Sequence, residues 1–175
     1  KVKLSHSFEE IISPDNILEA WKEFVKGKRK KRDVKEFEFR LMDNILQLHS
    51  EPKNFFYRHG AYKAFNISDP KPRKIHKALV RDRVLHHAIY NVLNPIFEPT
   101  FIANSFSCLK GKGTHKGVNI LAKTLREVSR NNTRACYALK CDIRKFFDSV
   151  DHNVLLAIIR QRIKDKDALC LLTEV

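Results

Sequence analysis

The chain has 175 residues, of which 34 are Lys or Arg and 20 are Asp or Glu, so its net charge is +14. Because 43% of the residues are hydrophobic, the composition excludes a disordered polyelectrolyte, and a basic folded surface attracts nucleic acid first and an anionic membrane second. No apolar run approaches the roughly 20 residues that span a bilayer, and the first residues lack the apolar core of a signal peptide, so we expect a cytoplasmic protein without a membrane partner.

Helical patterns flank a basic run near the N-terminus. Ser13 can cap a helix in which Pro14 suits the first turn, and Gly27 ends it. Residues 26–32, KGKRKKR, carry six basic side chains. Two interpretations of this run stay open, a solvated linker and a contact with the backbone of a nucleic acid. Asp33 is expected to cap a second helix, with an apolar stripe made by Val34, Phe37, Leu41, Ile45 and Leu48.

In the middle of the chain the pattern changes from helical to strand-like. Residues 62–67 and 73–75 have strand character on either side of the turn sequence SDPKP, which predicts a β-hairpin with basic residues at its tip. A helical pattern returns at residue 80, and Pro95 and Pro99 are expected to end it. Thr114 can then cap a further helix, which the sequence RNNTR breaks.

The last third of the chain predicts a strand followed by a helix. In residues 137–143, YALKCDI, an apolar face made by Tyr137, Leu139, Cys141 and Ile143 is expected to pack on helices. Asp151 caps a last helix whose buried residues are expected to be Val154, Leu155, Ile158, Ile159 and Ile163. This order of elements predicts an α+β fold rather than a regular series of βαβ units.

Asp142 is the most informative acid in the sequence. It lies on the face of the predicted strand opposite the apolar residues, at the end of that strand, where carboxylates commonly meet a metal ion or a substrate. An acid that merely begins a turn is an equally good interpretation of the spacing. No cysteine or acid lies at ligand spacing from His86, His87 and His115, so we do not expect these histidines to bind a metal. The cysteines form no C-x-x-C pair, which favours reduced thiols.

The segment CDIRKFFDSVDHNVL resembles the first catalytic motif of reverse transcriptases, in the form that bacterial retron-type and group II intron-like enzymes carry. Residues 62–101 resemble the first fingers block of the same family, and NSFSCLKGKGTHKGV resembles the second. Three ordered blocks between residues 57 and 165 make the resemblance specific. Within the family, the sequence is most similar to enzymes of diversity-generating retroelements. The resemblance implies an N-terminal helical extension at 1–56, fingers at 57–133 and the start of a palm at 134–175.

The resemblance implies roles for the residues around Asp142. Asp142 matches the catalytic aspartate that binds both magnesium ions, and the carbonyl group of Ile143 matches a backbone ligand of one of them. Phe147 matches the aromatic gate that lies under the deoxyribose and excludes a 2′-hydroxyl group. The amides around Lys145 and Phe146 match those that face the triphosphate. Asp148 and Asp151 are interpreted as turn and cap residues.

The two fingers blocks supply further candidates. Arg73 matches the arginine that binds the incoming triphosphate, with Lys71 as its partner, although a solvated hairpin tip explains both residues equally well. Contributions from Lys63 and Asn66 stay open. The glycine-rich block implies contacts with the template strand and the nucleotide, and its candidates are Lys110, Gly111, Lys112 and Gly113. Leu109 stands where relatives usually have arginine, which departs from the pattern of the family.

The Y-x-D-D block of reverse transcriptases does not occur in the sequence, and one aspartate cannot hold two magnesium ions in catalytic geometry. We therefore expect an incomplete RNA-directed DNA polymerase, inactive by itself, whose partners are an RNA template, a DNA primer or RNA–DNA duplex, and deoxynucleoside triphosphates, with Mg²⁺ as cofactor. An accessory protein of a retroelement is an open additional partner. The alternative function is a non-catalytic RNA-binding module that reuses the fingers scaffold.

Overall fold

The computed structural model describes residues 7–68, 70–107, 109 and 111–175, so Cys108 and Lys110 lie outside the described residues. The chain forms two compact units. The first unit combines Lys1–Phe97 with Asp151–Val175, and the second consists of Glu98–Val150. The regions that the family blocks imply, 1–56, 57–133 and 134–175, stay a prediction.

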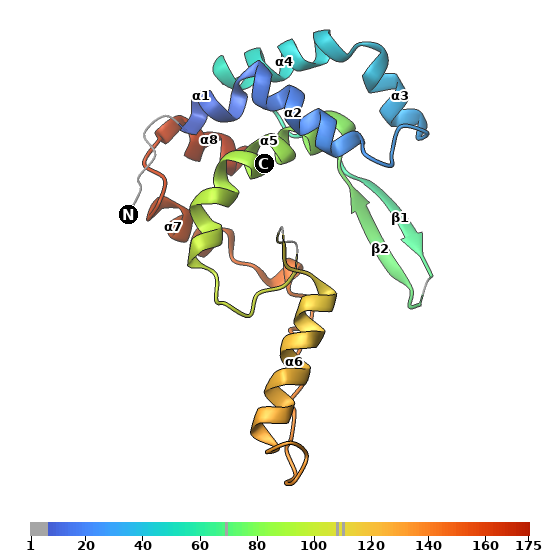
Figure 1. Ribbon diagram of the computed structural model, residues 1–175. Coiled ribbons are helices and arrows are strands. Elements are labelled where there is room, and N and C mark those ends of the chain that lie inside the picture. The colour runs from blue at the N-terminus through green and yellow to red at the C-terminus, as the bar shows by residue number, and fades with distance from the viewer. Residues whose placement is uncertain (1–6, 69, 108, 110) are drawn as a thin grey trace. The chain divides into compact units, whose positions relative to one another are not determined.

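The first unit is mostly helical and carries a two-stranded antiparallel sheet, which confirms the α+β class (Figure 1). The strands β1 (Lys63–Ile67) and β2 (Arg73–Lys77) pair from Lys63 opposite Lys77 to Ile67 opposite Arg73, so the predicted hairpin is confirmed. The helices of the unit are α1 (Ser7–Ile12), α2 (Pro14–Val25), α3 (Arg32–Phe39), α4 (Leu41–Lys53), α5 (Val80–Phe97), α7 (His152–Arg160) and α8 (Lys166–Glu174).

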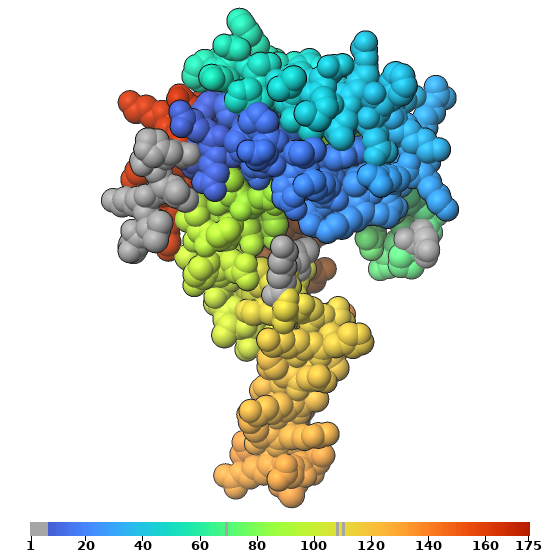
Figure 2. Space-filling view, turned by 45° about the horizontal axis from the view of Figure 1, so that its top comes forward, coloured from blue at the N-terminus to red at the C-terminus, as the bar shows by residue number. Residues whose placement is uncertain are grey.

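The core of the first unit lies where α2 packs on α5, with α1, α3, α4 and α8 around this pair. The α2 helix forms because Ser13 and Pro14 define its start, and the Ser13 hydroxyl oxygen accepts a hydrogen bond from the Asn16 amide at 3.3 Å. One α2 face buries Trp21 and Phe24, and the Trp21 ring lies 5.1 Å from that of Phe37. Figure 2 shows the continuous surface that α2, α3 and α4 form over this core.

The second unit has much less regular structure. Its elements are the 3₁₀ turns η1 (Glu98–Thr100) and η2 (Phe147–Ser149) and the helix α6 (Thr114–Val128). No residue of α6 is buried, and Val118 and Leu121 are exposed. One close approach exists, because a Cβ atom at Gly117 would lie 3.3 Å from the Phe106 ring. Three successive residues with left-handed backbone, Arg130 to Asn132, follow α6 and agree with the predicted break.

The predicted strand at residues 137–143 is wrong. The segment has no regular secondary structure, and Tyr137 and Leu139 are 95% and 90% exposed instead of packed on helices. Cys141 and Ile143, on the same predicted face, are exposed as well. A strand is stable only where a neighbour satisfies its backbone groups, and in the described part of the chain β1 and β2 pair only with each other. The alternation of apolar and polar residues can mark one face of a segment for packing, but it does not provide the neighbouring strand that the backbone needs.

Several predicted helix ends are also wrong. The helix predicted from Asp33 divides into α3 and α4 at Arg40, and α3 begins at Arg32. Asp33 is not its cap, because its carboxylate bonds to Lys77 and Arg83 instead. Pro95 lies inside α5, which continues to Phe97. Gly113, not Thr114, occupies the N-cap position of α6, and no side chain makes a cap hydrogen bond there.

The C-terminal helices agree with the sequence in part. The Asp151 carboxylate caps α7 as predicted, accepting hydrogen bonds from the amides of Asn153 and Val154 at 2.8 and 3.2 Å. Ile163 is buried as expected. The expected burial of three α7 residues is wrong, because α7 packs chiefly on α8 and leaves 57%, 44% and 50% of Val154, Leu155 and Ile158 exposed. Among the described residues, no helix combines the length and apolar character needed to cross a membrane.

Candidate functional site

Asp142 lies in the second unit at the end of the irregular segment and is exposed. Ile143, whose carbonyl oxygen is the second expected ligand, is also exposed. Carboxylate and carbonyl oxygens are the ligands that magnesium prefers, and magnesium is commonly held by one or two carboxylates together with substrate phosphates. These two groups therefore fit one part of a magnesium site. Within the described ranges, no three His, Cys, Asp or Glu side chains gather in a way that could hold a metal ion.

The turn that follows Asp142 displays two aromatic rings. Lys145 has a left-handed backbone, with φ of +51°, and this reverses the chain direction. Ser149 fixes the turn, because its hydroxyl donates to the Phe146 carbonyl at 2.8 Å and its amide donates to the Lys145 carbonyl at 3.1 Å. The rings of Phe146 and Phe147 meet edge to face at 5.4 Å. Phe146 is 50% exposed and Phe147 is 87% exposed, so neither ring belongs to a core in this structure.

The glycine-rich block lies in the same unit, before α6. Gly111 and Gly113 have φ of +71° and +152°, which favours glycine, and a side chain at either would meet open space. The Lys112 ammonium group donates to the Ala103 carbonyl at 3.2 Å. Leu109, at the position where the family that the sequence resembles usually has arginine, is buried and only 8% exposed. The expected role of Lys110 lies outside the described residues.

Lys71 and Arg73 belong to the first unit, on the hairpin. Lys71 lies in the bend between the strands and Arg73 begins β2, and both are exposed. The register places Arg73 opposite Ile67 and Asn66 opposite Lys74. The hairpin thus presents its cations to solvent at the tip, as the sequence predicts. Their roles in binding a nucleotide remain a prediction, as do those of Asp142, Ile143, Lys145, Phe146 and Phe147.

The basic run at residues 26–32 is only partly free of internal partners. Lys26 pairs with Glu23, Arg29 with Glu38 and Arg32 with Glu36, at 2.6, 3.0 and 2.8 Å. The Lys28 ammonium group lies 4.7 Å from the centre of the Phe24 ring and donates to its carbonyl oxygen. Four of the six cations therefore have intramolecular contacts, and Lys30 and Lys31 are the two most available for an anionic partner.

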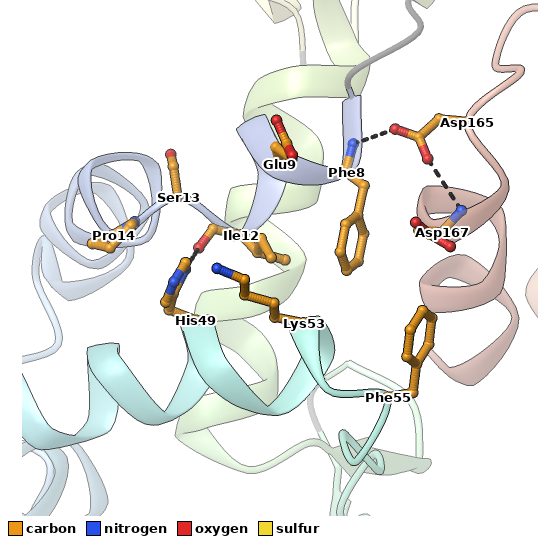
Figure 3. Close-up of a pocket in the computed structure, with 10 residues that line it drawn as sticks. All are labelled: Phe8, Glu9, Ile12, Ser13, Pro14, His49, Lys53, Phe55, Asp165 and Asp167. Atoms are coloured by element: carbon orange, nitrogen blue, oxygen red, sulfur yellow. Dashed lines mark hydrogen bonds between the residues drawn. The ribbon is translucent and has the colours of Figure 1, made fainter.

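A pocket of about 470 Å³ lies elsewhere in the first unit, between α1, α4 and α8 (Figure 3). The rings of Phe8 and Phe55 line it together with Lys53 and His49. Asp165 also lines it, but this carboxylate accepts from the Phe8 amide at 2.8 Å and from the Asp167 amide at 3.1 Å. Asp165 thus joins α1 to α8, and the pocket contains none of the residues predicted for the site.

Sequence reasoning missed a buried polar cluster at the start of α5. Asp82 is fully buried and accepts a hydrogen bond from the Tyr57 hydroxyl at 2.9 Å. Burial, followed by the charge of Asp82, raises the pKa of Tyr57. His86, one turn along α5, stacks on His59 at 5.3 Å, and burial lowers its pKa below the usual value. In the sequence this cluster is visible only as R-D-R, three charges in succession at the start of an apolar helix, which does not distinguish a buried acid from a solvated one.

Comparison with known proteins finds distant similarity to several curated proteins, two of which are named for introns. It is 26% identical over 137 residues to nuclear intron maturase 1 (mitochondrial) of Arabidopsis thaliana, which covers 77% of this chain and 18% of the relative. It is 28% identical over 127 residues to a 91 kDa protein in the cob intron of Schizosaccharomyces pombe, covering 72% and 15%. It is 27% identical over 105 residues to protein YkfC of Escherichia coli, covering 60% and 27%.

One of these relatives is named an intron maturase and another is named for the intron in which it lies, at 26% and 28% identity. The chain spans between 15% and 27% of the length of these three relatives. No family model matches it. The similarity agrees with the group II intron-like part of the sequence resemblance and does not extend to the retron-type or diversity-generating subdivisions.

Proposed function

We propose that this chain forms the fingers and the first palm segment of an RNA-directed DNA polymerase. The observation that carries the proposal is the joint exposure of Asp142 and of Phe147, which lies five residues later in the turn that follows. An aromatic residue that serves packing is buried, whereas a carboxylate for a metal ion and a ring for a sugar must both face the substrate. The relationship to intron maturases supports the same class of protein.

Each exposed group has a distinct role in nucleotidyl transfer. The Phe147 ring lies under the deoxyribose and excludes a 2′-hydroxyl group by its bulk. The amides of Lys145 and Phe146 donate hydrogen bonds to the triphosphate. The planar guanidinium group of Arg73 donates two parallel hydrogen bonds to phosphate oxygens, and the ammonium group of Lys71 adds a positive charge beside it.

Magnesium is the expected cofactor, and when bound it stabilises the charge that develops on the transferred phosphoryl group. The Asp142 carboxylate and the Ile143 carbonyl group are the residues of this chain that would hold it. A Y-x-D-D block supplies the remaining carboxylates in the family, so the chain by itself binds nucleic acid without extending a primer.

The partners follow from the charge of +14 and from the glycine-rich block. An RNA template, with a DNA primer or an RNA–DNA duplex, lies against Gly111, Lys112 and Gly113, with Lys110 as a further contact. Deoxynucleoside triphosphates are the substrates. An accessory protein of a retroelement is a further partner, and the cytoplasm is the expected location.

A non-catalytic RNA-binding module is the second candidate function. It is favoured by the basic composition and by the name of one relative, which is an intron maturase. This function needs neither a metal ligand nor a sugar gate, so it predicts that no primer extension depends on Asp142 or Phe147.

The direct test uses the 175-residue chain with RNA and with a primer–template duplex. Binding dominated by phosphate contacts weakens by orders of magnitude between about 50 and 200 mM salt, and we expect that steep dependence here. A flat response to salt contradicts an RNA-binding function of either kind. To separate the two candidates, primer extension is measured in a protein that joins this chain to a Y-x-D-D block, with Asp142 intact and replaced by Asn.

A further inference from the structure

Three successive residues at the start of α5 connect this helix to three different segments of the first unit. Arg81 bonds through its guanidinium group to Glu51 of α4. Asp82 accepts from the loop that precedes β1. Arg83 donates to the Asp33 carboxylate of α3 at 3.1 Å. The triplet R-D-R therefore joins α5 to α4, to the loop before β1 and to α3.

Asp82 fixes the chain that enters β1. One carboxylate oxygen accepts from the Tyr57 hydroxyl at 2.9 Å, and the other accepts from the Gly60 amide at 3.1 Å. The backbone approaches so closely that a Cβ atom at Gly60 would lie 2.5 Å from Leu79 and 2.9 Å from Asp82. Since Tyr57 keeps its proton at neutral pH, its hydroxyl group remains the donor. The chain is thus held three residues before β1 begins.

Asp33 fixes the chain that leaves β2. The same oxygen atom of its carboxylate accepts from Lys77, the last residue of β2, at 2.6 Å and from Arg83 at 3.1 Å. The Arg83 guanidinium group also lies 4.8 Å from the centre of the Phe24 ring, which ties it to α2. Asp33 is therefore the junction of α3, α5 and the hairpin.

The hairpin has little else to hold it. Every residue of β1 is exposed, and in the described part of the chain the two strands pair only with each other. The hairpin extends away from the helices of the unit (Figure 1). A two-stranded hairpin by itself is marginally stable in water. Its order and direction therefore depend on the anchors at its two ends.

We propose that Arg81–Arg83, Asp33 and Tyr57 form a positioning hub for the hairpin. The hub holds the hairpin in one direction and thereby places Lys71 and Arg73 for phosphate, while its own members do not touch the nucleotide. This inference rests on the proposed function of the hairpin tip.

Amide hydrogen exchange of the 175-residue chain tests the hub without any ligand. Asp33→Asn removes the charge that holds Lys77 and Arg83, so we expect the amides of β1 and β2 to exchange about tenfold faster. The amides of α2 and α5 should change by less than about twofold, because a local opening of the hairpin does not expose the core helices. Tyr57→Phe, which removes only one hydroxyl group, should loosen the hairpin in the same way. Unchanged exchange of the strands in both variants overturns the proposal.

The matched control is Glu36→Gln. It removes a negative charge from the same helix, about one turn away, and the Glu36 carboxylate bonds to Arg32 with 63% of its side chain exposed. This variant should leave the exchange of the hairpin as it is in the native chain. Loosening by Glu36→Gln as large as that by Asp33→Asn contradicts the proposal, because the effect would then follow net charge rather than the hub.

A double-mutant cycle tests the link between the hub and the tip, with dATP and magnesium as the probe. Arg73→Ala should weaken binding about tenfold in the native chain but less than about twofold in the Asp33→Asn chain, because the tip is no longer placed there. If Arg73→Ala weakens dATP binding tenfold in both chains, the hub does not position the tip, and the proposal of the hub is contradicted. The tip then remains a proposed phosphate site. No loss in the native chain contradicts the proposed function of the tip, and the exchange experiment still decides on the hub.

Discussion

The two units of the molecule differ in whether they bury aromatic rings. In the first unit Trp21 and Phe24 fill the space between helices and Asp82 is fully buried and bonded, while Phe39 and Phe56 at the surface of the same unit are 90% and 78% exposed. Among the described residues of the second unit no aromatic ring is buried, and Phe147 and Tyr137 are 87% and 95% exposed. The first arrangement stabilises a scaffold, and the second presents chemical groups to a partner. Burial thus marks Trp21 and Phe24 as packing residues, whereas exposure by itself does not identify a binding residue, because Phe39 and Phe56 are exposed as well.

The largest expected effect concerns the acid of the second unit. In a protein that joins this chain to a Y-x-D-D block, Asp142→Asn should lower primer extension by roughly 100- to 1,000-fold, because it removes charge stabilisation that only the chemical step needs. Affinity for RNA should stay nearly unchanged. Asp148→Asn, in the same turn, is the matched control and should keep activity. Wild-type extension by the Asp142→Asn protein would show that Asp142 is a turn residue.

A stability measurement on the 175-residue chain sharpens the comparison between the units. Phe24→Ala should lower the free energy of unfolding by roughly 3–5 kcal/mol, as for other buried aromatic residues. Phe147→Ala should change it by less than about 0.5 kcal/mol, because its ring is exposed. Thermal or denaturant unfolding gives both values. A large loss of stability in Phe147→Ala contradicts the outward arrangement of the second unit.

The basic run of the first unit offers a third test. Among the described residues, Lys30 and Lys31 make no ion pair of the kind that Arg29 and Arg32 make. The double change of both lysines to Ala should therefore weaken RNA binding uniformly across sequences. Each lost phosphate contact should reduce the salt slope by about 1. Arg32→Ala, which breaks a pair with Glu36, should have less effect. Equal effects of the two changes indicate that internal pairing does not limit contact with RNA.

The smallest expected effect is a pH dependence of stability in the first unit. Burial and the neighbouring His59 lower the pKa of His86, so the unfolded chain binds a proton at a higher pH than the folded chain. The stabilisation is present above about pH 6.5 and is lost as the pH falls toward the lower folded pKa. Melting temperatures between pH 7 and 5 should fall less steeply in His86→Phe than in the native chain. His115→Phe, at an exposed site, is the control and should match the native slope.

Local chemistry predicts a large part of the first unit. Ser13, Pro14 and Asp151 mark the helix ends correctly because a cap needs only its own turn. The hairpin follows likewise from turn residues between two short strands. The prediction that Asp33 caps a helix fails because Lys77 and Arg83, which are distant in sequence, bond to its carboxylate. The strand at residues 137–143 fails for a similar reason, since pairing depends on a partner that alternation cannot supply.

The sequence could predict which residues belong to the candidate site, but not how exposed or buried they are. Asp142 and Phe147 stand out by motif, and the structure adds that both are exposed, Asp142 before the turn and Phe147 within it. The hub residue Asp82 could not be identified from sequence, because three adjacent charges at a helix start suggest a solvated surface. Its burial depends on Tyr57 and Gly60, which lie 25 and 22 residues away along the chain.

The selectivity of nucleotide incorporation tests the central claim most directly. In a protein that joins this chain to a Y-x-D-D block, the ratio of kcat/KM for ribonucleotide to that for deoxyribonucleotide is measured with Phe147 intact and with Phe147→Ala. If the ring excludes the 2′-hydroxyl group, the smaller side chain admits the wrong substrate, and the ratio rises by tenfold or more, about 1.4 kcal/mol. An unchanged ratio, with activity on both substrates lowered together, contradicts the account and leaves Phe147 without a role in choosing the sugar.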